Sequence, residues 1–259
     1  MLRSMSLKSK LLLGPLLLGS SLAVQAAVSL DFNTSGQFAE NFSTFQTEGL
    51  IAQAPGGGLG NSGHVNLGII TAAQIWTFNT AFRGDLTSWS AEFYLKGTYF
   101  KQFGFTSDAT PRQIEGMPVN SAETAYQAHI ALGSGNGTGD GDAIGLYKDG
   151  AVAASSLISV PLTDSWYRYK ISVDYLGSDN FDVTGTIHTA DASGALLTEI
   201  GFIRSTINNP GLASANQAHL YFGFNYPGES VDNFSTTIPE PSVLGLVALS
   251  LGFSFRRRR

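Results

Sequence analysis

Apolar and polar residues alternate along most of the chain, and this two-residue period is the first structural signal in the sequence. Between positions 89 and 96, every second residue is apolar: Trp89, Ala91, Phe93 and Leu95. Side chains of a β-strand point alternately to the two faces of a sheet, so the pattern predicts a strand with one buried and one exposed face. It also places Trp89 in the core.

More than ten such segments follow one another, separated by clusters of Gly, Asn, Asp and Ser, and none has the period of an amphipathic helix of four turns. The predicted strands are 29–32, 64–70, 74–79, 89–96, 101–106, 144–148, 152–159, 167–175, 181–187, 196–204, 219–225 and 230–235. So many strands favour an all-β fold, a two-sheet antiparallel β-sandwich of the jelly-roll type. No repeat of about 20 to 50 residues marks a propeller or solenoid, so we expect one domain, residues 28–236.

Two hairpins are indicated by their turns. Asp149 and Gly150 separate two predicted strands and suit the positive φ angles of a two-residue turn. A longer hairpin is expected for 167–175 and 181–187, because the alternation stops at 176–180 and then resumes.

The N-terminus has the three parts of a secretory signal peptide. Arg3, Lys8 and Lys10 precede an apolar run at 11–18, and small residues follow at 24–26. The run is shorter than the roughly 20 apolar residues of a membrane-spanning helix. We expect residues 1–26 to be removed by cleavage after Ala26.

The C-terminus has three elements in a fixed order. Pro239, Glu240 and Pro241 come first, and an apolar stretch at 243–255, expected to be a helix, follows. The chain then ends in four basic residues: Arg256, Arg257, Arg258 and Arg259. Positive charge is retained on the cytoplasmic side of a membrane, so this end favours a transient inner-membrane anchor.

Residues 238–259 resemble the PEP-CTERM sorting signal. The resemblance implies that an exosortase-type membrane protease recognises Pro239, Glu240 and Pro241, while Arg256 to Arg259 stop translocation. It further implies a Gram-negative, biofilm-forming host and delivery to the cell surface, outer envelope or extracellular matrix. Whether the tail is cleaved or exchanged for a lipid link stays open.

The charge balance of the exported part narrows the choice of partners. Removing three basic residues at the N-terminus and four at the C-terminus leaves 8 of the 15 Lys and Arg, against 19 of the 20 Asp and Glu, a formal net charge of −11. Nucleic-acid-binding proteins attract phosphates with Lys and Arg, so no nucleic acid partner is expected. The chain has no cysteine, so the domain relies on its core rather than on disulfides.

The last third of the chain resembles the laminin-G-like, or concanavalin-like, jelly-roll superfamily. The similarity is carried by three segments: 166–175, 185–187 and 231–235. It implies glycan or matrix binding, and the fold itself does not decide between functions.

A glycine-rich segment, 133–142, is the candidate metal site. Calcium takes six to eight oxygen ligands, and glycine allows backbone carbonyls to join carboxylates around the ion. Asp140 and Asp142 are the expected ligands, with Asn136 as a third. The alternative is a polar loop without an ion.

Exposed aromatic rings stack on sugars, and Trp76 is the tryptophan that we expect to contact a ligand. No Glu-x-Asp-x-Glu pattern of a retaining glycosidase is present. Gln127, His129 and Tyr226 resemble faintly the catalytic residues of jelly-roll alginate lyases, but the arginine and lysine expected nearby are missing. The other histidines, His64, His188 and His219, lack metal-ligand spacing and are expected at the surface or in turns.

Three functions therefore remain open. The first is a non-catalytic glycan-binding module, with extracellular polysaccharide as its partner. The second is a purely structural component of the envelope or biofilm matrix. The third is a polysaccharide lyase or hydrolase, for which the sequence offers no complete catalytic set.

Overall fold

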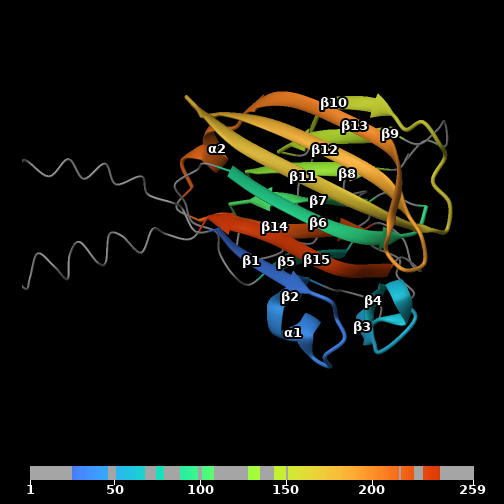
Figure 1. Ribbon diagram of the computed structural model, residues 1–259. Coiled ribbons are helices and arrows are strands. Elements are labelled where there is room, and N and C mark those ends of the chain that lie inside the picture. Colours follow the sequence, from blue (N-terminus) through green and yellow to red (C-terminus); the bar gives the residue numbers. More distant parts are fainter. Residues whose placement is uncertain are drawn as a thin grey trace, which may run out of the picture. The chain divides into compact units, whose positions relative to one another are not determined.

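The computed structural model describes residues 25–45, 51–67, 74–78, 88–98, 101–107, 128–134, 143–149, 151–215, 217–224 and 230–239. Their strands belong to one compact unit, Val24–Pro241, and form two antiparallel sheets packed face to face (Figure 1). The predicted all-β sandwich is confirmed. Residues 1–24 of the expected signal peptide and residues 240–259 of the expected sorting tail lie outside the described residues.

Sheet A contains eight strands: β1 (Gln25–Leu30), β3 (Ile51–Ala54), β4 (His64–Leu67), β6 (Ser88–Lys96), β11 (Trp166–Gly177), β12 (Asn180–Ala190), β13 (Leu196–Asn208) and β15 (Ser230–Pro239). Their order is β13-β12-β11-β6-β15-β4-β3, and β1 pairs with β15 as well. The first and last described segments are therefore neighbours in one sheet, with Gln25 opposite Pro239.

Sheet B contains seven strands: β2 (Phe42–Phe45), β5 (Gln74–Phe78), β7 (Lys101–Thr106), β8 (His129–Ser134), β9 (Ala143–Lys148), β10 (Ala151–Leu157) and β14 (His219–Phe224). Their order is β10-β9-β8-β7-β14-β5-β2. Three short helices accompany the strands in the described part of the chain: α1 (Gln37–Asn41), η1 (Leu59–Asn61) and α2 (Pro210–Ala213).

Most predicted strands are confirmed within a few residues, and three strands are additional. The four-residue strands β2 and β3 were not predicted, and neither was β8. Gly133 and Ser134 belong to β8, so the expected loop at 133–142 was wrong at its first two residues. Every residue of β8 is buried, and a strand covered on both faces shows no polar alternation.

The core between the sheets consists largely of aromatic rings. Phe93 of sheet A is fully buried, and its ring centroid lies 5.0 Å from that of Phe103 in sheet B. Trp89, also buried as predicted, lies 5.3 Å from Phe105 across the same interface. Edge-on aromatic pairs contribute about 0.5–1.5 kcal/mol beyond the area that they bury. This core holds the sandwich together in a chain without cysteine.

A buried carboxylate fixes the glycine-rich segment 55–63 to sheet A. Asp232 of β15 is fully buried and accepts hydrogen bonds from the Leu59 backbone N–H and the Ser62 hydroxyl, both at 2.7 Å. A Cβ at Gly58 would lie 2.4 Å from an Asp232 oxygen, so the loop needs glycine there to approach. Burial raises the pKa of Asp232, and the hydrogen bonds from Ser62 and Leu59 oppose that rise.

Candidate functional site: the outward face of sheet B

Four neighbouring strands of sheet B separate an apolar inner face from a polar outer face. On β7, β8, β9 and β14, the inward positions carry the core residues, such as Phe103, Leu132, Leu146 and Phe222. The outward positions between them carry polar and aromatic side chains: Gln102, Thr106, His129, Tyr147, His219 and Tyr221. All six are buried. We call this set of residues the sheet-B face.

Glycines form the floor of the sheet-B face. In the register of the strands, Gln102 lies between Gly133 and Gly223, and Gly133 in turn pairs with Gly145. A Cβ at Gly145 would lie 3.0 Å from the Tyr147 ring, so the phenol lies over this glycine. The combination leaves flat backbone beside upright polar and aromatic side chains, an arrangement suited to a flat polar ligand.

Gln102 and Tyr221 are the centre of the sheet-B face. The Gln102 amide donates a 2.9 Å hydrogen bond to the Tyr221 hydroxyl, and each side chain is only 2 % exposed. The Gln102 carbonyl oxygen is buried and has no hydrogen-bond partner among the residues that the structure describes. An unsatisfied buried acceptor costs about 1–3 kcal/mol, and such groups in native proteins call for an explanation such as a binding role.

His129 stands next to Tyr221. Their ring centroids lie 5.6 Å apart with the planes at 82°, an edge-to-face contact. The backbone of His129 is fixed by Asp149 in the β9–β10 turn, whose carboxylate accepts a 2.9 Å hydrogen bond from the His129 N–H. This contact aligns the start of β8 with the end of β9, so the imidazole is positioned by two strands.

The sheet-B face carries no formal charge when its histidines are neutral. Burial raises the pKa of Tyr147 to about 12, so its phenol stays protonated at neutral pH. None of the six outward residues is Asp, Glu, Lys or Arg. The face therefore favours a neutral ligand rich in hydroxyl groups over a strongly charged one.

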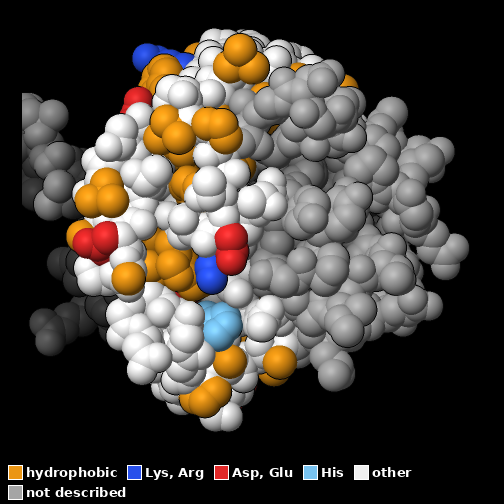
Figure 2. Space-filling view, turned by 90° about the vertical axis from the view of Figure 1, so that its right-hand side faces the viewer, with side chains coloured by type: hydrophobic (Ala, Val, Ile, Leu, Met, Phe, Trp, Pro, Cys, Tyr) orange, Lys and Arg blue, Asp and Glu red, His pale blue; other side chains and the backbone are white. Residues whose placement is uncertain are grey.

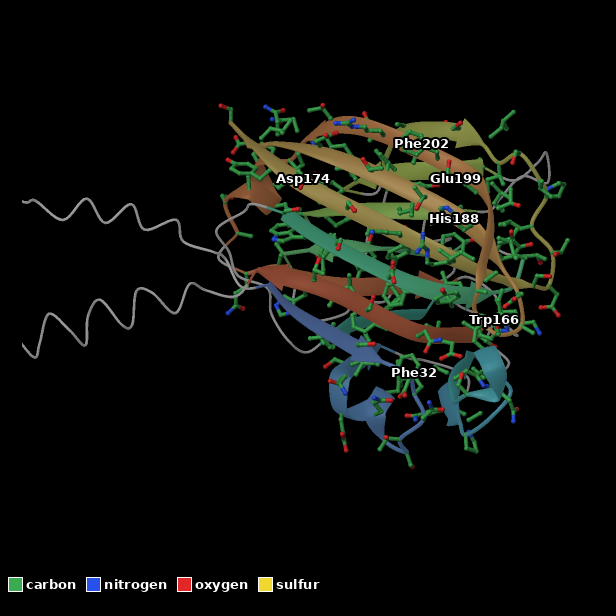
Figure 3. The ribbon with its side chains drawn as sticks, in the orientation of Figure 1. Phe32, Trp166, Asp174, His188, Glu199 and Phe202 are labelled. Atoms are coloured by element: carbon green, nitrogen blue, oxygen red, sulfur yellow. The ribbon has the colours of Figure 1, made fainter. Side chains whose placement is uncertain are left out.

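The outward face of sheet A differs from the sheet-B face, because its charged side chains pair with each other across neighbouring strands. Arg168 lies 3.7 Å from Glu92, and Arg204 holds Asp182 through its Nε and Nη2 atoms. His188 lies 3.7 Å from Glu199, and Figure 3 shows both on neighbouring strands of this sheet. Burial, followed by the Arg168 charge, lowers the pKa of His188. Such pairs are ordinary on half-exposed sheets.

The structure tests only some of the residues predicted from the sequence. Asn136, Asp140 and Asp142 lie outside the described residues, as do Glu240, Pro241 and Arg256 to Arg259. Within the described residues, no group of three or more His, Asp or Glu could hold a metal ion. Gln127 and Tyr226 also lie outside the described residues, and the tyrosine whose ring contacts His129 in the described part is Tyr221.

Trp76, Ala26 and Pro239 fall within described strands. Trp76 is in β5, where its backbone pairs with Phe222 and Thr44; its contact with a ligand stays a prediction. Ala26 is the second residue of β1 and pairs with Ile238, while Pro239 ends β15. No helix among the described residues has the length and apolar character needed to cross a membrane.

Two histidines differ from the prediction. His64 and His219 are buried rather than exposed, because they are the first residues of β4 and β14 and so belong to the two sheets. Gln102, Tyr147 and Tyr221 were missed as site residues. A partial signal for them is present in the sequence, since three predicted strands each carry a glycine on the polar side of the alternation: Gly104, Gly145 and Gly223.

Comparison with known proteins supports the fold. No family model matches the chain, and no curated protein matches its sequence. A solved lectin from Bauhinia forficata, in complex with GalNAc, superposes with a TM-score of 0.54 at 13% identity, covering 83% of this chain and 98% of the lectin.

Two bacterial structures are similar to the same degree. A protein of unknown function from Shewanella oneidensis MR-1 gives a TM-score of 0.53 at 19% identity, covering 85% of this chain and 88% of that one. A protein of unknown function with a galectin-like fold, from Bacillus subtilis, gives 0.50 at 13% identity, covering 82% and 94%. At these identities the likeness establishes the lectin-like jelly-roll fold.

Proposed function

We propose that this protein is an exported, non-catalytic glycan-binding protein of the cell envelope or biofilm matrix, and that the sheet-B face holds the sugar. The observation that carries the proposal is the buried carbonyl oxygen of Gln102. It lies beside a glycine floor and has no hydrogen-bond partner within the described part of the chain. A sugar hydroxyl is the donor that this oxygen needs. The Tyr147 and Tyr221 rings supply apolar surface for the face of a sugar ring.

The comparisons support a sugar as the ligand class. The similar Bauhinia forficata structure is a lectin in complex with GalNAc. The uncharged character of the sheet-B face agrees with a neutral sugar, and the net charge of −11 expected for the exported part disfavours polyanions unless cations bridge them.

Calcium is part of the proposal through the segment between β8 and β9. Asn136, Asp140 and Asp142 lie in this segment, which begins directly after Ser134 and ends directly before Ala143. Both strands contribute glycines to the floor of the site. A calcium ion held by these oxygens would fix the connection between two strands of the site.

Export and sorting rest on the two ends of the sequence. The proposed partner is an exosortase-type membrane protease that recognises Pro239, Glu240 and Pro241. The inner membrane is a transient partner through the apolar segment at 243–255. The final location is the cell surface, the outer envelope or the extracellular matrix.

The test is glycan-array binding of the protein with and without calcium, repeated with two matched variants. Tyr221→Phe removes the hydroxyl that accepts the Gln102 hydrogen bond, so we expect about a tenfold loss of affinity, the equivalent of one net hydrogen bond. Tyr94→Phe is the matched control in sheet A, where the tyrosine hydroxyl donates a hydrogen bond to the Gly194 carbonyl. Equal affinity of the two variants, or no binding by the parent protein, would contradict the proposal.

A polysaccharide lyase is the second candidate, and the contact between His129 and Tyr221 favours it. An imidazole and a phenol side by side can act as base and acid in β-elimination. A lyase would release unsaturated sugar ends from a polysaccharide, which absorb in the ultraviolet. Binding without such release supports the non-catalytic function, whereas neither binding nor release supports a purely structural matrix protein.

A further inference from the structure

Strand β10 is an edge strand without the protection that such strands normally carry. It lies at one end of sheet B, with β9 as its single partner among the described strands. Six of its seven residues are exposed, including Val152 at 56 % and Leu157 at 78 %. Natural edge strands are usually short, charged or covered, because their free backbone groups pair with other chains.

The other three ends of the two strand orders, β2, β3 and β13, are protected. β2 and β3 are only four residues long. β13 carries the charged side chains of Glu199 and Arg204 on its exposed positions. By contrast, the chain is uncharged from Gly150 to Thr163, a segment that contains all of β10.

We infer that β10 pairs antiparallel with β10 of a second copy of this chain, joining the two B sheets into one continuous sheet. Copies of an acidic chain, with a net charge of −5 over its full length, repel each other over most of their surface. The uncharged β10 segment is a place where two copies meet without like charges. A strand paired antiparallel with its own copy also forms a closed two-fold interface.

Exposed apolar side chains complete the interface. In the register with β9, Val152 lies beside Tyr147 and Leu157 beside Ala143, which places both on the outward side of sheet B. The register shift between Val152 and Ala154 leaves Ala154–Leu157 as the regular stretch on which pairing is centred. Figure 1 shows β10 at the rim of the sandwich. Figure 2 shows that several groups of hydrophobic side chains are exposed on one side of the molecule, some of them next to charged side chains.

The geometry has a consequence for ligand binding, which rests on the proposed function. The two-fold axis of an antiparallel strand pair stands perpendicular to the joined sheet, so the two sheet-B faces point to the same side. The dimer is therefore bivalent toward a polysaccharide, and linked sites raise the apparent affinity for a surface well above that of one site.

Sedimentation velocity of the full chain, at about 1 to 100 μM, tests the inference, because an edge-strand interface is small and a micromolar dissociation constant is expected. Leu157→Lys places like charges across the two-fold axis, so the dimer dissociation constant rises about tenfold or more. Leu176→Lys is the matched control, since Leu176 is also exposed, at 60 %, but belongs to β11. Circular dichroism confirms that both variants remain folded.

A parent protein that stays monomeric over this range, or an equal change for both leucine variants, overturns the inference. Retention on an immobilised polysaccharide separates the dimer from the proposed function. If the sheet-B face binds sugar, Leu157→Lys keeps its affinity for a free oligosaccharide and loses retention on the surface. If dimers form and no sugar binds, the self-association stands and the proposed function fails.

Discussion

At the scale of single residues, a glycine decides how closely the two sheets approach. Gly185 lies on β12 between Ile171 and Ile203, on the inward face of sheet A. A Cβ at this position would lie 2.4 Å from a methyl carbon of Leu132 in sheet B. The contact between the sheets therefore depends on the missing side chain.

Gly185→Ala is expected to lower the free energy of unfolding by about 1–3 kcal/mol, because overpacking forces neighbours off their preferred rotamers. Gly201→Ala is the matched control on β13, where a Cβ meets Ile144 at an ordinary 3.5 Å. Urea unfolding followed by tryptophan fluorescence measures both variants. Equal stabilities of the two would show that the interface around Leu132 adapts freely.

Asp232 gives a pH-dependent prediction. Burial raises its pKa in the folded protein above the usual carboxyl value of 3.8, so the folded state holds this proton more tightly than the unfolded state. Asp232 therefore stabilises the folded protein fully when the pH is below its usual pKa. This stabilisation is lost as the pH rises through the raised pKa of the folded state. Carbon-13 NMR of the carboxyl group should show a titration midpoint above 3.8.

Comparison with Asp232→Asn isolates this effect, because asparagine does not titrate. The variant leaves the Leu59 N–H and the Ser62 hydroxyl with a poorer acceptor, at a cost of about 1–3 kcal/mol. The difference in unfolding free energy between parent and variant should shrink from about pH 4 to pH 7. A difference that grows over this range would mean that the folded-state pKa is lowered instead.

The sequence predicts individual residues well where one alternating strand decides their environment. Trp89 is in the core for that reason. His219 was misjudged because its neighbours come from other strands: it lies opposite Thr106, and its ring nitrogen is 3.4 Å from the Phe78 carbonyl oxygen. Burial of a polar residue depends on contacts between distant segments, which local alternation does not contain.

At the scale of elements, the turn between β11 and β12 carries local strain. Gly177 pairs with Asn180, so Ser178 and Asp179 form a two-residue turn, with φ angles of 50° and 64°. Both angles lie in the left-handed region, which suits Asn and Gly better than Ser and Asp.

Replacing Ser178 with Asn and Asp179 with Gly should raise the free energy of unfolding by about 1 kcal/mol, since the favoured residues occupy the same turn. The contacts made here come from the backbone, such as the Asp179 carbonyl that accepts the Asn209 N–H, and they survive the change. Asp164→Gly with Ser165→Asn is the control, at positions without positive φ. Thermal unfolding measures the stability of both double variants. A less stable Ser178→Asn, Asp179→Gly variant would contradict the left-handed conformation of the turn.

The elements that the sequence missed have a common physical cause. β8 is buried on both faces, so its residues show no polar alternation. β2 and β3 span four residues each, too few for a period of two to stand out. The long hairpin of β11 and β12 was predicted because both strands alternate over many residues and end at a recognisable turn.

At the scale of the whole molecule, the candidate site is a product of strand order. Gln102, His129, Tyr147 and Tyr221 are far apart in the sequence, and they meet because β9, β8, β7 and β14 are neighbours in sheet B. The glycines on these strands could be noticed in the sequence. Their assembly into one floor could not, since alternation within a strand carries no information about which strands pair.

The pairing of β1 with β15 links the two ends of the domain. Gln25 lies opposite Pro239, and Ala26 lies opposite Ile238. The expected cleavage after Ala26 would therefore remove the strand partners of Ile238 and Pro239. The start of the Pro-Glu-Pro motif is then freed from the sheet. A protease needs an extended and accessible chain. Removal of the signal peptide would make the chain accessible at the start of the proposed sorting motif.

We therefore expect that Pro239→Ala, or deletion of Arg256 to Arg259, moves the protein between the inner-membrane and outer-envelope fractions. Pro161→Ala is the control, because Pro161 is exposed and lies in the connection between β10 and β11. Immunoblots of separated membranes measure the location, and N-terminal sequencing verifies that Ala27 is the first residue. If cleavage occurs after Ala26 and neither tail variant moves the protein, sorting does not depend on these residues, and the pairing of β1 with β15 is purely structural.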